Sequence, residues 1–151
     1  MRSFFKVTQF LRDLMEEDDY INTIVFGDFA HADLQKKNIF PMGVINPLSA
    51  SLANGQVNEF TFEIGVLNIR DLSTDEIVDK FISNDNEIFS LNSTFASLNK
   101  MMKEIRNRYN DDLIEIVSVS NANPIIFSNT NILDGWSIEI TIQIPNISIC
   151  L

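Results

Sequence analysis

The residues best suited to chemistry are His31, the only histidine in the chain, and two nearby aspartates, Asp28 and Asp33. Imidazole nitrogens and carboxylate oxygens are common ligands of divalent metal ions, so this spacing could form part of a metal site. Aspartate is equally typical of turns, because its side chain accepts hydrogen bonds from nearby backbone N–H groups. We favour the structural turn, and the sequence therefore predicts neither a metal site nor a cofactor.

No motif for catalysis surrounds the other reactive side chains. Cys150 is the only cysteine, and a Cys–His or Ser–His pair would have to use His31, around which no nucleophile motif occurs. Glu59, Glu63 and Glu139 could supply carboxylates for acid–base chemistry, but their sequence context is typical of the polar face of a sheet. The chain also lacks a glycine-rich phosphate-binding loop. We therefore predict that the protein is not an enzyme.

Length and charge predict a single acidic domain spanning residues 1–151. A chain of 151 residues is long enough to bury a core of its own. Its formal net charge of −10 argues against a protein that holds nucleic acid by the phosphates, because such binding requires clustered Lys and Arg. A single cysteine cannot form an intrachain disulfide, and no apolar run approaches the ~20 residues that span a bilayer. With no signal-peptide core near the start, we expect a cytoplasmic protein.

The stretch at residues 57–71 is predicted to be the central antiparallel strand, because apolar and polar residues alternate along it. Its apolar residues are Phe60, Phe62, Ile64 and Val66. The preceding run, Ile39–Asn46, also alternates and is predicted to pair with it as a hairpin. The apolar side of that run is formed by Phe40, Met42 and Val44. The connection Pro47–Gln56 is longer than a tight turn needs, so we expect a loop that contacts another protein.

Two short helices are predicted, one on each side of this hairpin in sequence. The first is capped by Ser3 and ends at the acidic run Glu16–Asp19, because negative charge is unfavourable at a helix C-terminus. Its apolar stripe is Phe4, Val7, Leu11 and Leu14. The second is predicted to open with a capping box formed by Ser73 and Glu76.

The main helix is predicted over Asn86–Tyr109, where apolar residues recur at steps of three and four. This stripe consists of Ile88, Leu91, Phe95, Leu98, Met102, Ile105 and Tyr109. We expect it to pack on the apolar face of the central strand, because each apolar face needs a partner. On that expectation, Phe95→Ala would cost about 3–5 kcal/mol, as truncations of buried phenylalanine do.

Shorter runs rich in β-branched residues complete the predicted sheet. Strands are expected at Ile21–Phe26, Leu113–Val119 and Gly135–Ile144. Between the last two, Asn121–Asp134 is predicted to be a loop that contains at most a short strand at Ile125–Phe127. The predicted fold class is therefore α+β, with a twisted, mostly antiparallel sheet packed against one long and one or two short helices.

The C-terminal tail, Asn146–Leu151, is predicted to leave the sheet at Pro145, which has no N–H to donate in a continuous strand. Beyond it, Ile147, Ile149 and Leu151 alternate with smaller residues. An extended segment with one apolar side can dock on the exposed edge of another sheet. The alternative is a tail that folds back on its own domain, and the sequence leaves both open.

Three segments follow the first helix in a suggestive order: NTIVFGD (Asn22–Asp28), DLQKKNIFP (Asp33–Pro41) and NEFTFEIGVLNIRD (Asn58–Asp71). Together they resemble the neck and tail-completion proteins of tailed bacteriophages, in the tail-terminator and connector-ring group. The similarity covers the first half of the chain, up to residue 72. It implies a small α+β subunit without enzymatic activity or cofactor, which forms an oligomeric ring that joins the portal of the head to the tail and lines the DNA channel.

The resemblance also implies partners and a location. The partners would be further copies in a homo-oligomeric ring and the portal or other neck and tail proteins, with no membrane contact. DNA would pass through the channel without specific binding, and an acidic ring suits that role because it offers few cations to the phosphates. Such a protein is located in the neck or tail of the virion, after assembly in the host cytoplasm.

Subunit contacts are predicted in the Pro47–Gln56 loop and in the tail. The predicted contact residues are Ser49, Ser51, Asn54, Gly55, Ile147, Ile149 and Leu151. The alternative function is a cytosolic module that binds a ligand or peptide against its sheet without catalysis. The two functions differ in size in solution, since a ring is much larger than a single chain and a binding module stays monomeric or dimeric.

Overall fold

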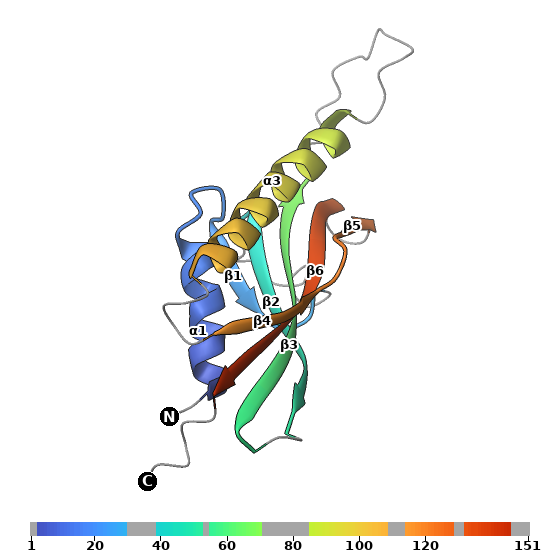
Figure 1. The fold of residues 1–151 in the computed structure, drawn as a ribbon. Helices are drawn as coiled ribbons and strands as arrows, with labels where there is room; N and C mark the ends of the chain where they lie inside the picture. Colours follow the sequence, from blue (N-terminus) through green and yellow to red (C-terminus); the bar gives the residue numbers. More distant parts are fainter. Residues whose placement is uncertain are drawn as a thin grey trace, which may run out of the picture.

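The computed structural model describes residues 3–29, 39–52, 55–70, 85–108, 114–128 and 132–145 (Figure 1). The described helices are α1 (Ser3–Glu16) and α3 (Asp85–Arg108). The described strands are β1 (Thr23–Phe26), β2 (Met42–Ser51), β3 (Val57–Ile69), β4 (Glu115–Val119), β5 (Asn123–Ser128) and β6 (Ile132–Pro145). The capping box predicted at Ser73 and Glu76 lies outside the described residues.

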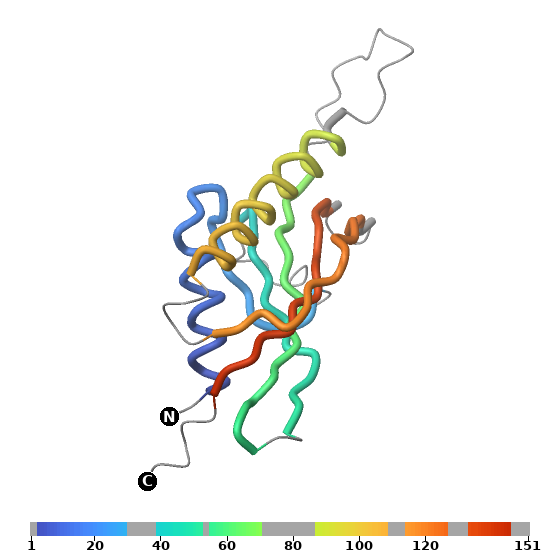
Figure 2. The backbone as a smooth tube through the Cα atoms, viewed as in Figure 1, coloured from blue at the N-terminus to red at the C-terminus, as the bar shows by residue number. Residues whose placement is uncertain are grey.

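The six strands form one sheet, in the order β1-β2-β3-β6-β4, with β5 also paired to β6. β1 runs parallel to β2, and all other pairs are antiparallel. Because β3 occupies one edge of β6 along its length, β4 and β5 pair with successive parts of the other edge. The backbone trace shows the long central strands twisting as they cross the molecule (Figure 2). The predicted α+β fold with a twisted, mostly antiparallel sheet is confirmed.

The main hydrophobic core lies between one face of this sheet and the two helices. From β3 it contains Phe60, Phe62, Ile64 and Val66, so the predicted alternation is confirmed. From β6 it contains Ile138, Ile140, Ile142 and Ile144. From α1 it contains Val7, Phe10, Leu11, Leu14 and Met15. Burying an aliphatic side chain of this size stabilises the fold by roughly 1.5–3 kcal/mol, so the alternation of β3 and β6 accounts for much of the driving force.

A smaller apolar cluster covers part of the opposite face of the sheet. Its buried members are Phe29, Met42, Val44, Leu67 and Leu133, with Phe40 packed against them. This confirms the prediction that Phe40, Met42 and Val44 lie on the same side of their segment. Gly65 on β3 lies beneath Phe29, and a Cβ atom there would come within 2.7 Å of the Phe29 ring. The position therefore admits only glycine without displacing the aromatic ring.

The apolar stripe predicted for α3 is only partly correct. Leu98, Met102 and Ile105 are buried as predicted, but Ile88 is 60% exposed and Phe95 is 45% exposed. The predicted burial of these last two residues is therefore wrong. From Glu87 to Ser97 the buried positions of α3 are instead small and polar: Ser90, Thr94 and Ser97.

Hydrogen bonds join α3 both to the segment that follows α1 and to the sheet. Ser97 Oγ donates to the buried carboxylate of Asp18 at 2.5 Å, and Trp136 Nε1 donates to the backbone carbonyl of Leu91 at 2.9 Å. Small side chains allow the helix to approach these groups closely, whereas larger ones would hold it away. Phe95 then lies beside the sheet, edge-on to Trp136 with ring centroids 5.3 Å apart.

The loop predicted at Pro47–Gln56 is wrong over its first five residues, because β2 continues through Pro47 to Ser51, whereas Gly55 and Gln56 lie between the strands as predicted. Its last three residues, Ser49, Ala50 and Ser51, pair with Thr61, Phe60 and Glu59 of β3, after a bulge that follows Pro47. β1 pairs with β2 only as far as Ile45, so the described residues leave the outer side of β2 as an edge beyond that point. Proline is tolerated on an edge strand, because its missing N–H breaks no ladder hydrogen bond there.

In the segment Asn121–Asp134, too, the structure has strands where the sequence predicted a loop. It was predicted to be a loop, but it contains all of β5 and the start of β6. The predicted short strand at Ile125–Phe127 is confirmed and is longer than expected. β5 also contains a proline, Pro124. Because β5 lies at the edge of the sheet, the missing N–H of this proline does not interrupt the strand.

These packing differences predict the relative cost of two truncations in α3. Leu98 is 2% exposed, so Leu98→Ala should lower the free energy of unfolding by about 2–5 kcal/mol. Phe95→Ala should cost less than Leu98→Ala, because nearly half of the Phe95 side chain is already in contact with solvent. Urea denaturation of both variants measures the difference, and a larger loss for Phe95→Ala than for Leu98→Ala would contradict the observed orientation of α3.

Candidate interaction surfaces

The predicted contact residues that the structure describes lie at one end of the β2–β3 hairpin. Ser49 and Ser51 are exposed on β2, and Gly55 lies in the following turn. The φ angle of Gly55 is 42°, in the left-handed region that glycine adopts without strain. The other predicted contacts fall outside the described residues: Asn54, Ile147, Ile149 and Leu151.

The first candidate surface, the β2 edge surface, consists of Phe4, Phe26 and the outer side of β2 from Pro47 to Ser51. Phe4 is 42% exposed and Phe26 is 45% exposed, and their ring centroids are 6.4 Å apart. Phe4 also stacks on the buried Phe62, with centroids 5.8 Å apart. The surface is thus an outward continuation of the core beside an unpaired strand edge, which is typical of sites of protein contact.

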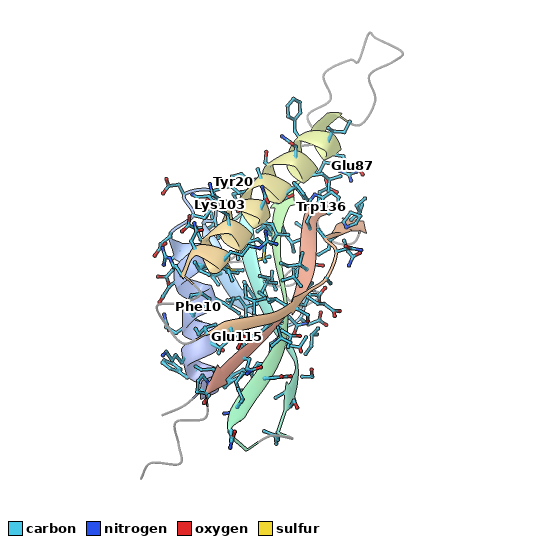
Figure 3. The ribbon with its side chains drawn as sticks, in the orientation of Figure 1. Phe10, Tyr20, Glu87, Lys103, Glu115 and Trp136 are labelled. Carbon is cyan, nitrogen blue, oxygen red and sulfur yellow. The ribbon has the colours of Figure 1, made fainter. Side chains whose placement is uncertain are left out.

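The second candidate surface, the β5 edge surface, consists of Ile126 on β5, Trp136 on β6, and Ile88 and Phe95 on α3. Ile126 is 52% exposed and lies opposite Asp134 in the register, so its side chain points to the helix-covered side of the sheet. Figure 3 shows Trp136 close to α3 and to the end of β5. Within the described ranges, no strand pairs with the outer side of β5.

A buried ion pair between the end of β3 and β6 lies beside the β5 edge surface and is linked to α3 through Glu87. Asp134 is fully buried and accepts two hydrogen bonds from the Arg70 guanidinium, each 2.7 Å long. Arg70 Nη2 also lies 3.3 Å from Glu87 Oε2, near the start of α3. The Asp134 carboxylate raises the pKa of Arg70, so Arg70 stays charged. No sequence pattern had singled out either partner, because each stands at the end of a strand with an ordinary polar context.

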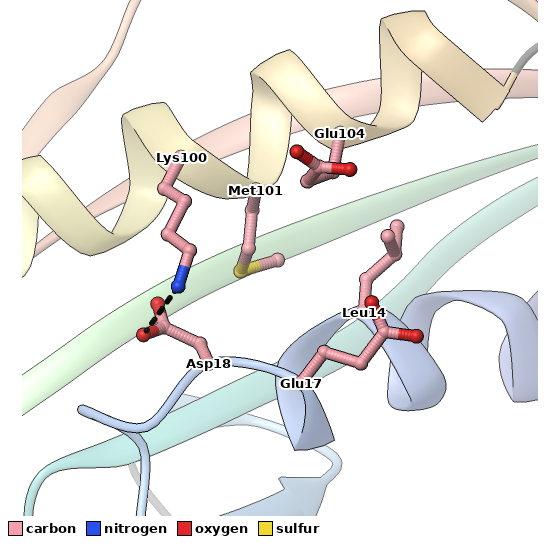
Figure 4. A pocket seen from close by; sticks show the side chains of 6 residues that line it. All are labelled: Leu14, Glu17, Asp18, Lys100, Met101 and Glu104. Atoms are coloured by element: carbon pink, nitrogen blue, oxygen red, sulfur yellow. Dashed lines mark ion pairs between the residues drawn. The ribbon is translucent and has the colours of Figure 1, made fainter.

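A second polar cluster joins the end of α1 to α3 (Figure 4). It forms a pocket of about 230 Å³ lined by Leu14, Glu17, Asp18, Lys100, Met101 and Glu104. Lys100 Nζ lies 3.7 Å from Asp18 Oδ1, and Arg108 donates hydrogen bonds to both carboxylate oxygens of Glu17. Arg108 lowers the pKa of Glu17, which therefore stays ionised and is a poor proton donor near neutral pH. We interpret the cluster as a structural contact that holds the end of α1 against α3.

The open face of the sheet, opposite the helices, is polar and acidic over the half farther from Phe29. Thr61 and Thr141 are linked by a hydrogen bond of 3.0 Å, and Ser137 donates to Glu63 at 3.1 Å. By register, its acidic residues are Glu59, Glu63, Glu115 and Glu139, which confirms the polar-face prediction for three of them. The described cations lie on the helices or on the helix-covered side: Lys6, Arg12, Arg70, Lys100, Lys103, Arg106 and Arg108. Among the described residues, the open face therefore carries carboxylates without Lys or Arg, whereas the helical side carries both signs of charge, as in the pairs of Glu17 with Arg108 and of Asp18 with Lys100.

The metal-ligand candidates are described only in part. Asp28 follows β1, whereas His31 and Asp33 lie outside the described residues, so the interpretation of this segment as a turn stays a prediction. Within the part of the chain that the structure describes, no group of three or more His, Cys, Asp or Glu is placed to hold a metal ion. None of the described helices combines the length and the apolar character needed to cross a membrane.

Comparison with known proteins provides no relative from which a function can be transferred. No protein-family model matches this sequence, and no curated protein matches it. The resemblance to phage neck proteins therefore stays a prediction, and the functional argument rests on the two edge surfaces and on the acidic open face.

The Arg70–Asp134 pair predicts a stability difference between two substitutions. Arg70→Met leaves the buried Asp134 carboxylate without its main partner, so the free energy of unfolding should fall by about 3–5 kcal/mol. Glu87→Gln is the matched control, because Glu87 is partly exposed and its loss should cost about 1 kcal/mol or less. Chemical denaturation followed by circular dichroism measures both. Equal losses would show that the buried Arg70–Asp134 pair contributes no more to stability than the partly exposed contact of Arg70 with Glu87.

Proposed function

We propose that this protein is a structural subunit that assembles edge to edge into a homo-oligomeric ring. Following the family resemblance, we assign the ring to the neck or tail of a tailed bacteriophage virion, as a tail terminator or connector ring. In that position it joins the portal to the tail and surrounds the channel through which DNA passes. The subunit takes no part in catalysis and needs no cofactor for this role.

The observation that carries this proposal is the presence of two different open edges on one sheet. The β2 edge surface and the β5 edge surface lie on opposite sides of the central β3–β6 pair. In the described part of the chain, each combines strand backbone that no further strand pairs with and exposed apolar side chains. Monomeric proteins usually cover such edges or place charged side chains on them, because an exposed strand edge pairs readily with other chains. Contact between two different surfaces is head to tail, and repeated head-to-tail contacts close into a ring when the rotation allows it.

The charge distribution supports the same proposal. Four glutamates lie on the open face of the sheet, whereas the described lysines and arginines lie on the helical side. A ring that turns the open face towards its axis presents carboxylates to the DNA and few cations that could hold the phosphates. DNA therefore passes without specific binding in this arrangement.

A second candidate, a peptide-binding module, uses the β5 edge surface in another way. An extended peptide from another protein can add to an exposed sheet edge, with backbone hydrogen bonds providing affinity. The module needs only the β5 edge surface, whereas the ring needs both edge surfaces. This difference decides the design of the test.

The head-to-tail contact predicts complementation between two assembly-deficient variants. Phe26→Lys places a charge in the β2 edge surface and Ile126→Lys places one in the β5 edge surface, and both positions are already partly exposed, so folding should persist. Each variant alone should stay at the mass of one chain, 17.2 kDa, while the wild type forms larger rings. An equimolar mixture should form heterodimers, because each variant keeps the surface that the other has lost.

Light scattering after size-exclusion chromatography measures these masses, and electron microscopy shows whether the wild-type particles are rings. The double variant Phe26→Lys/Ile126→Lys is the control, because it has no intact edge surface and should remain monomeric in every mixture. A wild-type chain that stays at 17.2 kDa over the full concentration range contradicts the ring and favours the peptide-binding module.

A further inference from the structure

The β5 edge surface is suited to accept one additional strand of defined length. β5 has six residues and is hydrogen-bonded to β6 on one side only, within the part of the chain that the structure describes. An extended segment that pairs with the outer side of β5 would satisfy the backbone N–H and C=O groups there. The acceptor therefore has room for about six residues in a regular ladder.

Only one side of an added strand would meet apolar groups. Ile126 points to the helix-covered side, where Ile88 and Phe95 of α3 remain exposed. Phe95 is held there by its edge-on contact with Trp136, and the start of α3 is held by the ion pair of Glu87 with Arg70. A strand bound at this edge should thus carry apolar residues at alternate positions, facing α3, and small or polar residues between them.

The segment Asn146–Leu151 has this pattern. Its six residues place Ile147, Ile149 and Leu151 on one side, with Ser148 and Cys150 between them. The β2 edge surface is a poorer acceptor for a regular strand, because it contains Pro47 and a bulge directly after it. The pattern and the ladder geometry both favour β5.

The tail cannot reach the β5 edge of its own chain. β6 ends at Pro145, which pairs with Val57, whereas β5 pairs with β6 no further along than Ser137. The eight residues from Ser137 to Pro145 span about 26 Å of extended strand. Six residues of fully extended chain span at most about 22 Å, so the tail falls short even before it crosses to the outer side of β5. Only a second copy of the chain can supply this segment.

We propose that residues 146–151 of one copy bind as an added strand on β5 of the next copy, with Ile147, Ile149 and Leu151 beneath α3. This inference rests on the proposed function, because it requires copies that contact one another. It also uses the same two surfaces that the proposed head-to-tail contact brings together. The tail leaves the sheet beside Val57, close to Phe60, which Phe4 of the β2 edge surface contacts at a centroid distance of 5.4 Å.

The single native cysteine provides a direct test by cross-linking. Cys150 lies within the tail, so Asn123→Cys on β5 introduces the only other thiol, at an exposed position beside the acceptor edge. A short thiol-specific cross-linker should join Cys150 of one copy to the introduced cysteine of another and produce a ladder of covalent oligomers. Lys103→Cys is the control, because it places an exposed thiol on α3 and outside the edge surface. Adding Cys150→Ser to Asn123→Cys should abolish the ladder.

A peptide experiment separates this inference from the proposed function. A fluorescent peptide of residues 145–151 should bind the full-length Phe26→Lys variant, which keeps an intact β5 edge surface, in an anisotropy titration. Its affinity should fall at least about tenfold for the full-length Phe26→Lys/Ile126→Lys variant, because the added lysine opposes the apolar side of the strand. A peptide with Ile147 and Ile149 both replaced by Ser should bind equally weakly to either variant.

The outcomes are distinct. Peptide binding without any assembly of the wild type would support the acceptor site and contradict the ring. Assembly with no cross-link above the Lys103→Cys control would overturn the tail proposal and leave the ring standing. A cross-link confined to one chain, which shifts the mobility of the monomer on a gel, would show that the tail folds back on its own domain and would also overturn it.

Discussion

The pairing of β3 with β6 is the constraint on which the rest of the structure depends. The two strands have 13 and 14 residues and stay in register from Val57 opposite Pro145 to Ile69 opposite Leu133. Each described neighbour is shorter, with 10 residues in β2, six in β5, five in β4 and four in β1. Long central strands with short neighbours leave backbone groups along both edges that no described strand pairs with, and such groups need water or a further segment as partner. The open edges are thus a direct result of the strand lengths.

The same pairing decides where the helices lie and which apolar residues they leave exposed. Along most of β3 and β6 the helix-covered side is apolar, and the second half of α3 is buried there. Towards Arg70 and Asp134 that side becomes polar, so the first half of α3 is held by an ion pair and hydrogen bonds instead. Its small polar residues face the sheet, and Ile88 and Phe95 are turned outwards beside β5. The β5 edge surface therefore results from the change of polarity along the central strands.

Strict alternation made the central strands predictable from sequence, because a period of two leaves no choice of which side chains enter the core. The helical stripe of α3 was less reliable. Ile88 and Phe95 fit the three-and-four spacing, but so do Ser90, Thr94 and Ser97, and hydrogen bonding to Asp18 and Trp136 decides between the two sides. The low strand propensity of proline also gave wrong predictions at Pro47 and Pro124, because a proline on an edge strand does not end the strand. The Arg70–Asp134 pair could not be foreseen, because its partners are brought together only by the register of β3 and β6.

The central claim is that the two sheet edges are open in a single copy and paired in the assembly. Hydrogen exchange of backbone amides, compared between the assembled wild type and the Phe26→Lys/Ile126→Lys variant, tests it most directly. The outward-facing amides of β5 and of β2 beyond Ile45, which do not bond to β6 or β3, should exchange rapidly in the variant and slowly in the wild type, while those of β3 and β6 stay protected in both. Equal protection of β2 and β5 in the two samples, or new protection confined to the acidic open face, would contradict assembly through the edges.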